Sequence, residues 1–361
     1  MTSPPPPTSL TEIARRVERR LESFLAPELE RWATFDPDLA EPMADIPRLV
    51  LGGGKRLRPA FCHWGFLAAG GDHEAAEAVP GPVVDAGAAF ELMHAFALFH
   101  DDVMDDAHTR RGAVTTHQRF ADMHRLGGWA GEDRRFGEGI AILVGDLAFV
   151  YSDQLMAGAP AAAWSVWNEL RVELNVGQLL DIVGSARSDR TVTRAERICR
   201  YKSGKYTVER PLHLGAALAA PDRLAEFGPI LSDYGLPLGD AFQMRDDVIG
   251  AFGDPDVTGK PVGGDLREGK PTPLLARAVR AADPVQAETL ARVGAPDLDD
   301  DEVREIQRVI VATGALEELE AEIATRVAMA VEAVTDAAGV LEGDAVDGLV
   351  ALAAYITDRR H

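Results

Sequence analysis

The stretch Leu98–Asp105, with the sequence LFHDDVMD, decides the fold of this chain, and the other segments can be interpreted from it. Asp101 and Asp105 are four residues apart, so on a helix their Cβ atoms lie about 6 Å apart on one face. Upstream residues recur at spacings of three and four, which predicts that this face continues into the protein as a helical stripe; they are Val84, Ala88, Glu91, His94 and Leu98. Inward-facing carboxylates are costly unless a cation neutralises them, and Mg²⁺ is the usual cation. Taken alone, the motif is equally compatible with a solvated acidic turn.

A second aspartate motif lies far downstream. The segment 242–247, FQMRDD, again follows an apolar helical run, from Tyr234 to Ala241. The sequence LGGGKRLRP at 51–59 precedes the first motif, and GK at 259–260 and DLREGK at 265–270 follow the second. This ordered set resembles the trans-isoprenyl diphosphate synthases, the polyprenyl synthetase family, over roughly residues 51 to 275. Because five or six motifs occur in the same order, the resemblance is specific.

The composition favours a mainly helical protein. The chain has 361 residues and 46% hydrophobic content, with only 6% aromatic residues, which is enough for a sizeable core. We expect an all-α fold. The resemblance implies that residues 10–361 form a single domain, a helical bundle of the isoprenoid-synthase type with a central active-site cavity. Residues 1–9 are rich in proline and are predicted to be a disordered tail. Residues 112–135 are predicted to form a polar loop, followed by a helix over 138–156.

The charge and the cysteines limit the classes of partner and compartment. A formal net charge of −21 argues against nucleic acid or an anionic membrane as a partner. A diphosphate substrate is also an anion, so Lys and Arg should be concentrated at the site. With two cysteines, Cys62 and Cys199, we expect buried free thiols rather than a disulfide framework. The start lacks the pattern of a signal peptide, and no uninterrupted apolar run approaches about 18 residues. We therefore expect a soluble cytoplasmic protein without stable membrane insertion.

The segment 51–59 is predicted to bind an anion. Its glycine turn opens a helix, where exposed backbone N–H groups and a positive dipole end favour negative charge, and Lys55 and Arg58 add charged donors. An ordinary solvated helix start is the alternative. The resemblance assigns isopentenyl diphosphate to a set of four residues, namely Lys55, Arg58, His94 and Arg111.

The resemblance assigns a second group of residues to the allylic diphosphate. Gln178 and Asp181 are three apart and so share one helix face, although plain surface residues would show the same spacing. In YKSGKYT at 201–207, Ser203 replaces the threonine of the family's lysine-threonine element. The Gly/Pro-rich loop after the second motif carries lysines that could close over bound diphosphates and exclude water. The full set is Arg110, Gln178, Asp181, Lys202, Ser203, Gln243, Lys260 and Lys270.

The mechanism implied by the resemblance is elongation by ionisation. Mg²⁺ ions, three per active site and replaceable by Mn²⁺, would bind Asp101, Asp105 and Asp246, with Asp102, Asp247 and Lys202 completing the catalytic set. The metals would stabilise the departing diphosphate. The allylic cation is then attacked by the double bond of isopentenyl diphosphate, and loss of a proton completes a five-carbon extension.

Three positions depart from the family pattern. Gly250 stands where the third aspartate of the second motif is expected, and Asp254 is a candidate partial substitute. His108 replaces an aspartate common before the paired arginines, and Val114 replaces the proline usual after them. The last two departures bear on the conformation of the loop, and none of the three removes a residue of the predicted metal set.

Two residues just upstream of Asp101 predict the product. A growing chain held at Asp101 would run back along the helix, where one turn advances about 5.4 Å. Phe96 and Ala97 lie just over one turn back, and an aromatic at the fifth position alone resembles one type of geranylgeranyl diphosphate synthase. Phe96 as plain core is the alternative.

Other functions stay open from the sequence. They are a farnesyl or longer polyprenyl diphosphate synthase, a class I terpene cyclase, and a non-catalytic subunit of a prenyltransferase heteromer. A terpene cyclase would not need Lys55 and Arg58, and non-catalytic subunits tend to lose aspartates that this chain keeps. A homodimer is expected on the resemblance alone.

Overall fold

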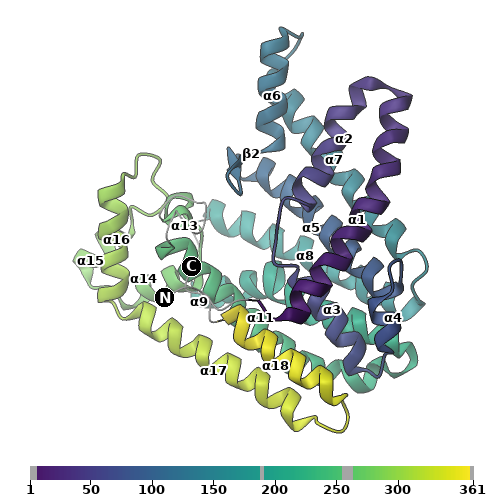
Figure 1. The fold of residues 1–361 in the computed structure, drawn as a ribbon. Helices are drawn as coiled ribbons and strands as arrows, with labels where there is room; N and C mark the ends of the chain where they lie inside the picture. The colour runs from purple at the N-terminus through teal and green to yellow at the C-terminus, as the bar shows by residue number, and fades with distance from the viewer. Residues whose placement is uncertain (1–5, 188–190, 254–262, 358–361) are drawn as a thin grey trace. The chain divides into compact units, whose positions relative to one another are not determined.

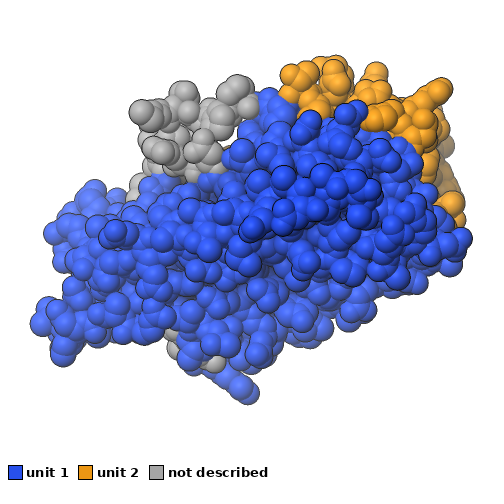
Figure 2. All heavy atoms as spheres, turned by 90° about the horizontal axis from the view of Figure 1, so that it is seen from below, with its two compact units in different colours: residues 1–7, 64–71, 161–361 blue, residues 8–63, 72–160 orange. Residues whose placement is uncertain are grey.

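The computed structural model describes residues 6–187, 191–253 and 263–357, and most of them lie in helices (Figure 1). Within this described part the strands are confined to one short hairpin. The described chain therefore has the all-α fold that the sequence predicts. It divides into two compact units, coloured in Figure 2: unit 2 holds residues 8–63 and 72–160, and unit 1 holds residues 1–7, 64–71 and 161–361. The single domain expected over residues 10–361 stays a prediction.

Unit 2 is built around a helix that is buried on most sides, α5 (Pro82–Met104). It packs against α7 and α1, and Pro82 opens it at a position where the missing N–H costs nothing. The elements of unit 2 are α1 (Thr8–Phe35), η1 (Pro37–Leu39), α2 (Ala40–Val50), the start of α3 (Leu57–Ala68), α4 (His73–Glu77), α5, β1 (Thr109–Arg110), β2 (Ala113–Val114), α6 (Thr116–Gly127) and α7 (Asp133–Met156).

Helix α1 shows how the pattern in the sequence produces this packing. Its buried residues recur at spacings of three and four, as an amphipathic helix requires; they are Leu10, Ile13, Val17, Leu21 and Leu25. The helix begins at Thr8, so residues 8 and 9 of the predicted tail are helical. The prediction of disorder for residues 1–5 falls outside the described residues.

The prediction of a loop over residues 112–135 is wrong. Residues Thr116–Gly127 form α6, and α7 begins at Asp133. The buried face of α6 includes His117 and His124 beside Phe120 and Ala121. Because two of these buried positions are histidines, the sequence does not show the apolar spacing that would predict an amphipathic helix. The helix ends at Gly128, which adopts the left-handed φ of 61° typical of a helix stop.

Unit 1 has its core where α11 meets the C-terminal helices. Residues with almost no exposure, such as Leu274, Ile306 and Leu319, form one apolar cluster with α11. The elements of unit 1 are the end of α3, α8 (Ala161–Arg187), α9 (Val192–Ile198), the π-helix η2 (Cys199–Glu209), α10 (Arg210–Ala219), η3 (Pro221–Arg223), α11 (Leu224–Phe252), α13 (Gly264–Glu268), α14 (Pro273–Ala281), α15 (Pro284–Leu290), α16 (Asp300–Ala312), α17 (Ala315–Asp336) and α18 (Gly343–Thr357).

Two described stretches are long and apolar enough, by length and composition, to cross a membrane. They are His73–Met104 and Asp133–Met156, and 67% and 44% of their apolar windows are buried. Core helices of soluble proteins pass the same test, and the first stretch contains α5, the central helix of unit 2. Cys62 and Cys199 are buried free thiols, as predicted.

Candidate active site

The first aspartate motif lies at the C-terminal end of α5. The N–H of Asp105 donates to the carbonyl of Asp101 over 2.8 Å, so the two residues are one helical turn apart. The last turn of α5, all of it described, contains no basic residue. The C-terminal end of a helix carries partial negative charge, which disfavours carboxylates. This end of α5 therefore favours a bound cation.

Asp102 differs from its two neighbours in the motif. It is buried, and it accepts a hydrogen bond from Arg110 Nε over 2.5 Å, whereas Asp105 is exposed. Burial raises the pKa of Asp102 to about 6, although the nearby Arg110 opposes the rise. Asp102 is thus the main anchor of Arg110, whose Nη2 also lies 3.5 Å from Asp101 Oδ2. Asp101 is half-buried and Asp105 is exposed, so both can offer carboxylate oxygens to a cation.

The paired arginines lie on the β1–β2 hairpin. Arg110 pairs with Ala113 across the hairpin, and Arg111 and Gly112 form its turn with φ of 53° and 76°. Arg111 donates to the carbonyl of Gly53 over 2.7 Å, which places its guanidinium against the glycine-rich segment. The two arginines therefore have different neighbours, one at the aspartates and the other at the predicted anion cradle.

The cradle contains a structural arginine that the sequence analysis did not single out. Arg56 is buried with φ of 50°, donates to Glu91 and Glu18, and contacts the carbonyl of Val50. These contacts neutralise the Arg56 charge within the protein. The neighbouring Lys55 is exposed and Arg58 is half-buried, which suits them better to binding an external anion.

Several arginine side chains lie near His94. The pKa of His94 lies well below its ordinary value, first because of burial and then because of repulsion from nearby guanidinium groups; these belong to Arg58, Arg111, Arg110 and Arg56. The structure thus brings Arg58, His94 and Arg111, three of the four predicted isopentenyl diphosphate residues, into one cationic region. Among the described residues, the non-glycine residues with positive φ are Arg56, Asp106 and Arg111. Strained backbone of this kind gathers at functional sites.

The predicted chain-length residues lie on the same helix. The Phe96 ring is half-buried and contacts the rings of His100 and Phe149, with centroids 4.7 Å away in each case. Phe149 belongs to α7, so the position of the Phe96 ring depends on a residue that local spacing could not identify. Ala97 is half-buried as well.

The second aspartate motif lies on α11 in unit 1. Asp247 is buried, accepts from Gln243 Nε2 over 3.0 Å, and has its Oδ2 buried without a hydrogen bond. Burial raises the pKa of Asp247 well above its ordinary value, and the charges of Asp265 and Asp246 raise it further. Asp246 is half-buried. Gln243 therefore holds Asp247, and the closely spaced carboxylates favour a cation here too.

Asp265 and Lys270 lie beside this motif. The Asp265 carboxylate occupies the space next to Gly250, and Lys270 Nζ lies 3.6 Å from Asp265 Oδ1. Asp265 is not among the predicted site residues, because it belongs to a separate motif, 15 residues after Gly250 in the chain. Lys260 and Asp254 lie outside the described residues.

The remaining predicted residues meet where η2 crosses α8. Lys202 Nζ forms an ion pair with Asp181 Oδ2 over 2.6 Å. A Cβ on Gly177 would lie 2.7 Å from Lys202 Cα, so only glycine allows the two backbones to approach this closely. Gln178 and Ser203 are half-buried. The π-helical conformation of η2 is rare and is typically found at functional sites.

Carboxylate oxygens are the ligands that Mg²⁺ prefers, so the donors in both motifs fit this ion. Within the described parts of the chain, no group of three His, Cys, Asp or Glu side chains forms a complete metal cluster. Mg²⁺ is commonly held by one or two carboxylates together with substrate phosphates. The buried, unbonded Oδ2 of Asp247 is consistent with such a site.

Comparisons with known proteins identify the family. The model of the polyprenyl synthetase family matches residues 40–310. A geranylgeranyl pyrophosphate synthase from Corynebacterium glutamicum, solved with isoprenyl diphosphate and magnesium, superposes with a TM-score of 0.89 at 37% identity, covering 97% of this chain and 99% of that one.

Curated relatives agree on the family but differ in product. A geranylfarnesyl diphosphate synthase of Aeropyrum pernix is 32% identical over 278 residues, 74% of this chain and 79% of that protein. A (2E,6E)-farnesyl diphosphate synthase of Mycobacterium tuberculosis is 29% identical over 360 residues, 97% of this chain and 90% of that protein. The chain belongs to the polyprenyl synthetase family and is a chain-elongating trans-prenyltransferase with the all-α isoprenoid-synthase fold.

Proposed function

We propose that this prenyltransferase elongates an allylic diphosphate with isopentenyl diphosphate and releases mainly geranylgeranyl diphosphate. The observation that carries the proposal is the pair of unlike sites on α5. His94 lies among guanidinium groups that can bind a diphosphate directly, and Asp101 and Asp105, about two turns further along, can bind one only through a metal. Two sites of this kind support two diphosphate substrates rather than the single substrate of a terpene cyclase.

The proposed roles follow from these contacts. Lys55, Arg58, His94 and Arg111 bind isopentenyl diphosphate. The allylic diphosphate is bound by Arg110, Gln178, Asp181, Lys202, Ser203, Gln243 and the lysines 260 and 270. Asp101, Asp105 and Asp246 hold Mg²⁺, three ions per site with Mn²⁺ as a substitute, and the metal supplies positive charge that stabilises the leaving diphosphate. Asp102 and Asp247 orient their neighbours through Arg110 and Gln243.

Exposed apolar residues support the proposed homodimer. On α7, Ile142, Leu143 and Val150 are 42%, 61% and 50% exposed, although burying such side chains is favourable. A second copy of the chain would cover them. Sedimentation at micromolar concentration showing only the 38.8 kDa chain would overturn the dimer. Cys62 and Cys199 are both buried free thiols, the state that a reducing cytoplasm favours.

The test is a product assay. The purified protein is incubated with isopentenyl diphosphate, each allylic primer and Mg²⁺, and the products are separated by length. We expect geranylgeranyl diphosphate to dominate and excess chelator to abolish turnover. Asp101→Ala should lower turnover by about three orders of magnitude while the protein stays folded. Asp122→Ala, which removes an exposed carboxylate on α6, is the matched control. Full activity of Asp101→Ala would refute the proposed metal role.

A further inference from the structure

The π-helix η2 is fixed by close contacts on two sides. On the α8 side, the Lys202 backbone packs directly on Gly177. On the α11 side, a Cβ on Gly239 would lie 2.7 Å from the Gly204 carbonyl oxygen, so these two backbones also touch. The residue after Gly239 is Asp240, which is 4% exposed. Lys202 therefore lies on a segment whose position depends on both neighbouring helices.

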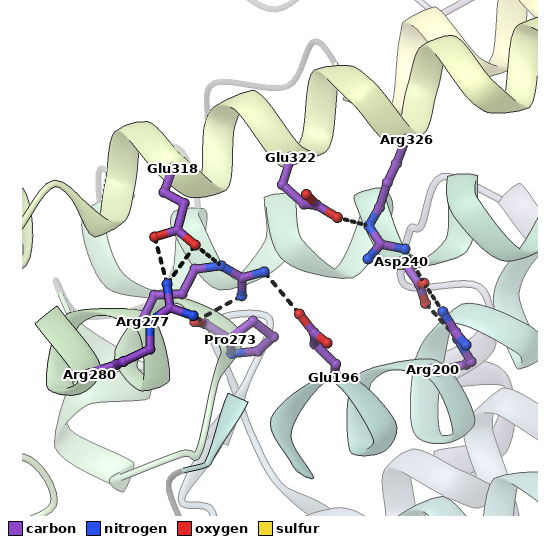
Figure 3. A network of polar contacts seen from close by, with 9 residues as sticks. All are labelled: Glu196, Arg200, Asp240, Pro273, Arg277, Arg280, Glu318, Glu322 and Arg326. Atoms are coloured by element: carbon purple, nitrogen blue, oxygen red, sulfur yellow. Dashed lines mark hydrogen bonds and ion pairs between the residues drawn. The ribbon is translucent and has the colours of Figure 1, made fainter. Parts of the chain in front are cut away.

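Asp240 connects this segment to the rest of unit 1. It accepts from Arg200 Nη2 over 2.6 Å and Nε over 3.3 Å, and from Arg326 Nη1 over 2.7 Å. Arg326 also donates to Glu322 over 2.7 Å (Figure 3). The fork of Arg200 thus pairs with a buried carboxylate, the geometry that restrains an arginine most strongly. Through Asp240, η2 is joined to α11 and α17.

The other end of η2 is anchored by a separate cluster. Lys205 pairs with Glu173 of α8, and Arg210 donates to both oxygens of Glu173 over 2.6 and 2.7 Å. Lys202 lies between the anchors at Arg200 and at Lys205. π-helical turns are rare in proteins, so contacts of this kind are needed to hold them. Loss of the Arg200 anchor would release the start of η2 and shift Lys202.

We propose that Asp240 is a positioning residue for Lys202: through Arg200 it holds η2 in the conformation that presents Lys202 Nζ beside Asp181. The inference rests on the proposed role of Lys202 at the allylic diphosphate. Asp240 is too deeply buried to bind a substrate and acts only through the two arginines.

Figure 3 also provides a matched control. In the same network, Glu318 of α17 accepts from Arg280 over 2.7 Å and lies 3.4 Å from Arg277, which in turn donates to Glu196 over 2.9 Å. This part joins α9, α14 and α17, and η2 is not among them. Glu318 is more exposed than Asp240, and removing its charge breaks ion pairs of the same network without touching Asp240 or Arg200.

The experiment compares Asp240→Asn with Glu318→Gln. We expect Asp240→Asn to raise the KM for the allylic diphosphate about tenfold, equivalent to one decade of affinity, and to leave the KM for isopentenyl diphosphate unchanged. Calorimetric binding of inorganic pyrophosphate with Mg²⁺ should weaken by a similar factor. Glu318→Gln should alter neither quantity. A change of both KM values, or of neither, in Asp240→Asn would overturn the inference.

A double-mutant cycle separates positioning from general destabilisation. If Asp240 acts through Lys202, adding Asp240→Asn to Lys202→Ala should cause no further loss, whereas independent effects would multiply and refute the inference. If Lys202→Ala alone leaves the allylic KM unchanged, the proposed role of Lys202 fails, which is a distinct result. Should Asp240→Asn not fold, Arg200→Gln breaks the same contact from its half-exposed partner and is expected to give the same allylic defect.

Discussion

The carboxylate of Asp265 occupies the space where a side chain at Gly250 would begin. A Cβ on Gly250 would overlap Asp265 Oδ2 and lie 3.1 Å from Oδ1. The position where the family has its third aspartate therefore lies against a carboxylate that comes from α13. Asp265 also acts electrostatically on Asp247, whose pKa it helps to raise.

We predict that Gly250→Ala weakens Mg²⁺ binding while the protein stays folded. The added Cβ must displace the end of the Asp265 side chain, so the Mg²⁺ concentration for half-maximal activity should rise severalfold. The higher helix propensity of alanine, about 1 kcal/mol, offsets part of the cost of moving Asp265. The control is Gly228→Ala, on the same helix, where a Cβ meets nothing within 4 Å. An unchanged Mg²⁺ titration in Gly250→Ala would exclude a role for the Asp265 carboxylate near the metal.

Substitutions at Arg56 and Arg58, two residues apart, should affect different properties: stability at Arg56 and substrate binding at Arg58. Arg56→Gln leaves Glu91 buried without its charged partner, so we expect the free energy of unfolding to fall by about 3 kcal/mol. Arg58→Ala should leave stability nearly unchanged and chiefly raise the KM for isopentenyl diphosphate. Urea unfolding and two-substrate kinetics measure both effects. An equal rise in KM for the allylic substrate would contradict the assignment of Arg58.

The spacing of residues in the sequence predicts helices, which depend on neighbouring residues. It does not predict contacts between residues that are far apart in the chain. The stripe from Val84 to Asp101 predicts one helix, and the structure confirms it as α5. The same spacing could not show that Glu91 pairs with Arg56, because that contact joins residues 35 apart. Likewise, nothing in CRYKSGKYTVE distinguishes a π-helix from an α-helix. Its conformation depends on contacts with Gly177 and Gly239 from other helices.

His63 should make stability depend on pH. Burial, together with repulsion from Arg16, lowers the pKa of His63 from 6.5 to about 4. Between these values the unfolded chain binds a proton that the folded protein does not, so the free energy of unfolding falls as pH is lowered from 6.5 to 4, by about 3 kcal/mol in total. His63→Gln should flatten this part of the pH profile in urea unfolding, whereas replacing the exposed His108 should not. An unchanged slope in His63→Gln would show that His63 is not the residue responsible.

The last prediction concerns product length and extends the role of Phe96 to its neighbour on α7. The Phe96 ring contacts Phe149 and His100 at equal centroid distances of 4.7 Å. These contacts restrain its rotation, so the ring can form a wall that stops the growing chain. Phe96→Ala should remove this wall and lengthen the product by one or more five-carbon units, and Ala97→Phe should shorten it toward farnesyl diphosphate.

Phe149→Ala removes the support of the wall while keeping the Phe96 side chain itself. We expect a mixture in which part of the product is one unit longer, because the Phe96 ring can then tilt into the vacated space. Phe99→Leu is the control, since Phe99 is buried on α5 without lying at the fourth or fifth position before Asp101. Product chromatography of the four variants checks the series. If Phe96→Ala and Phe149→Ala lower the unfolding temperature but keep the wild-type length, Phe96 is ordinary core, and the assignment of geranylgeranyl diphosphate loses its physical basis.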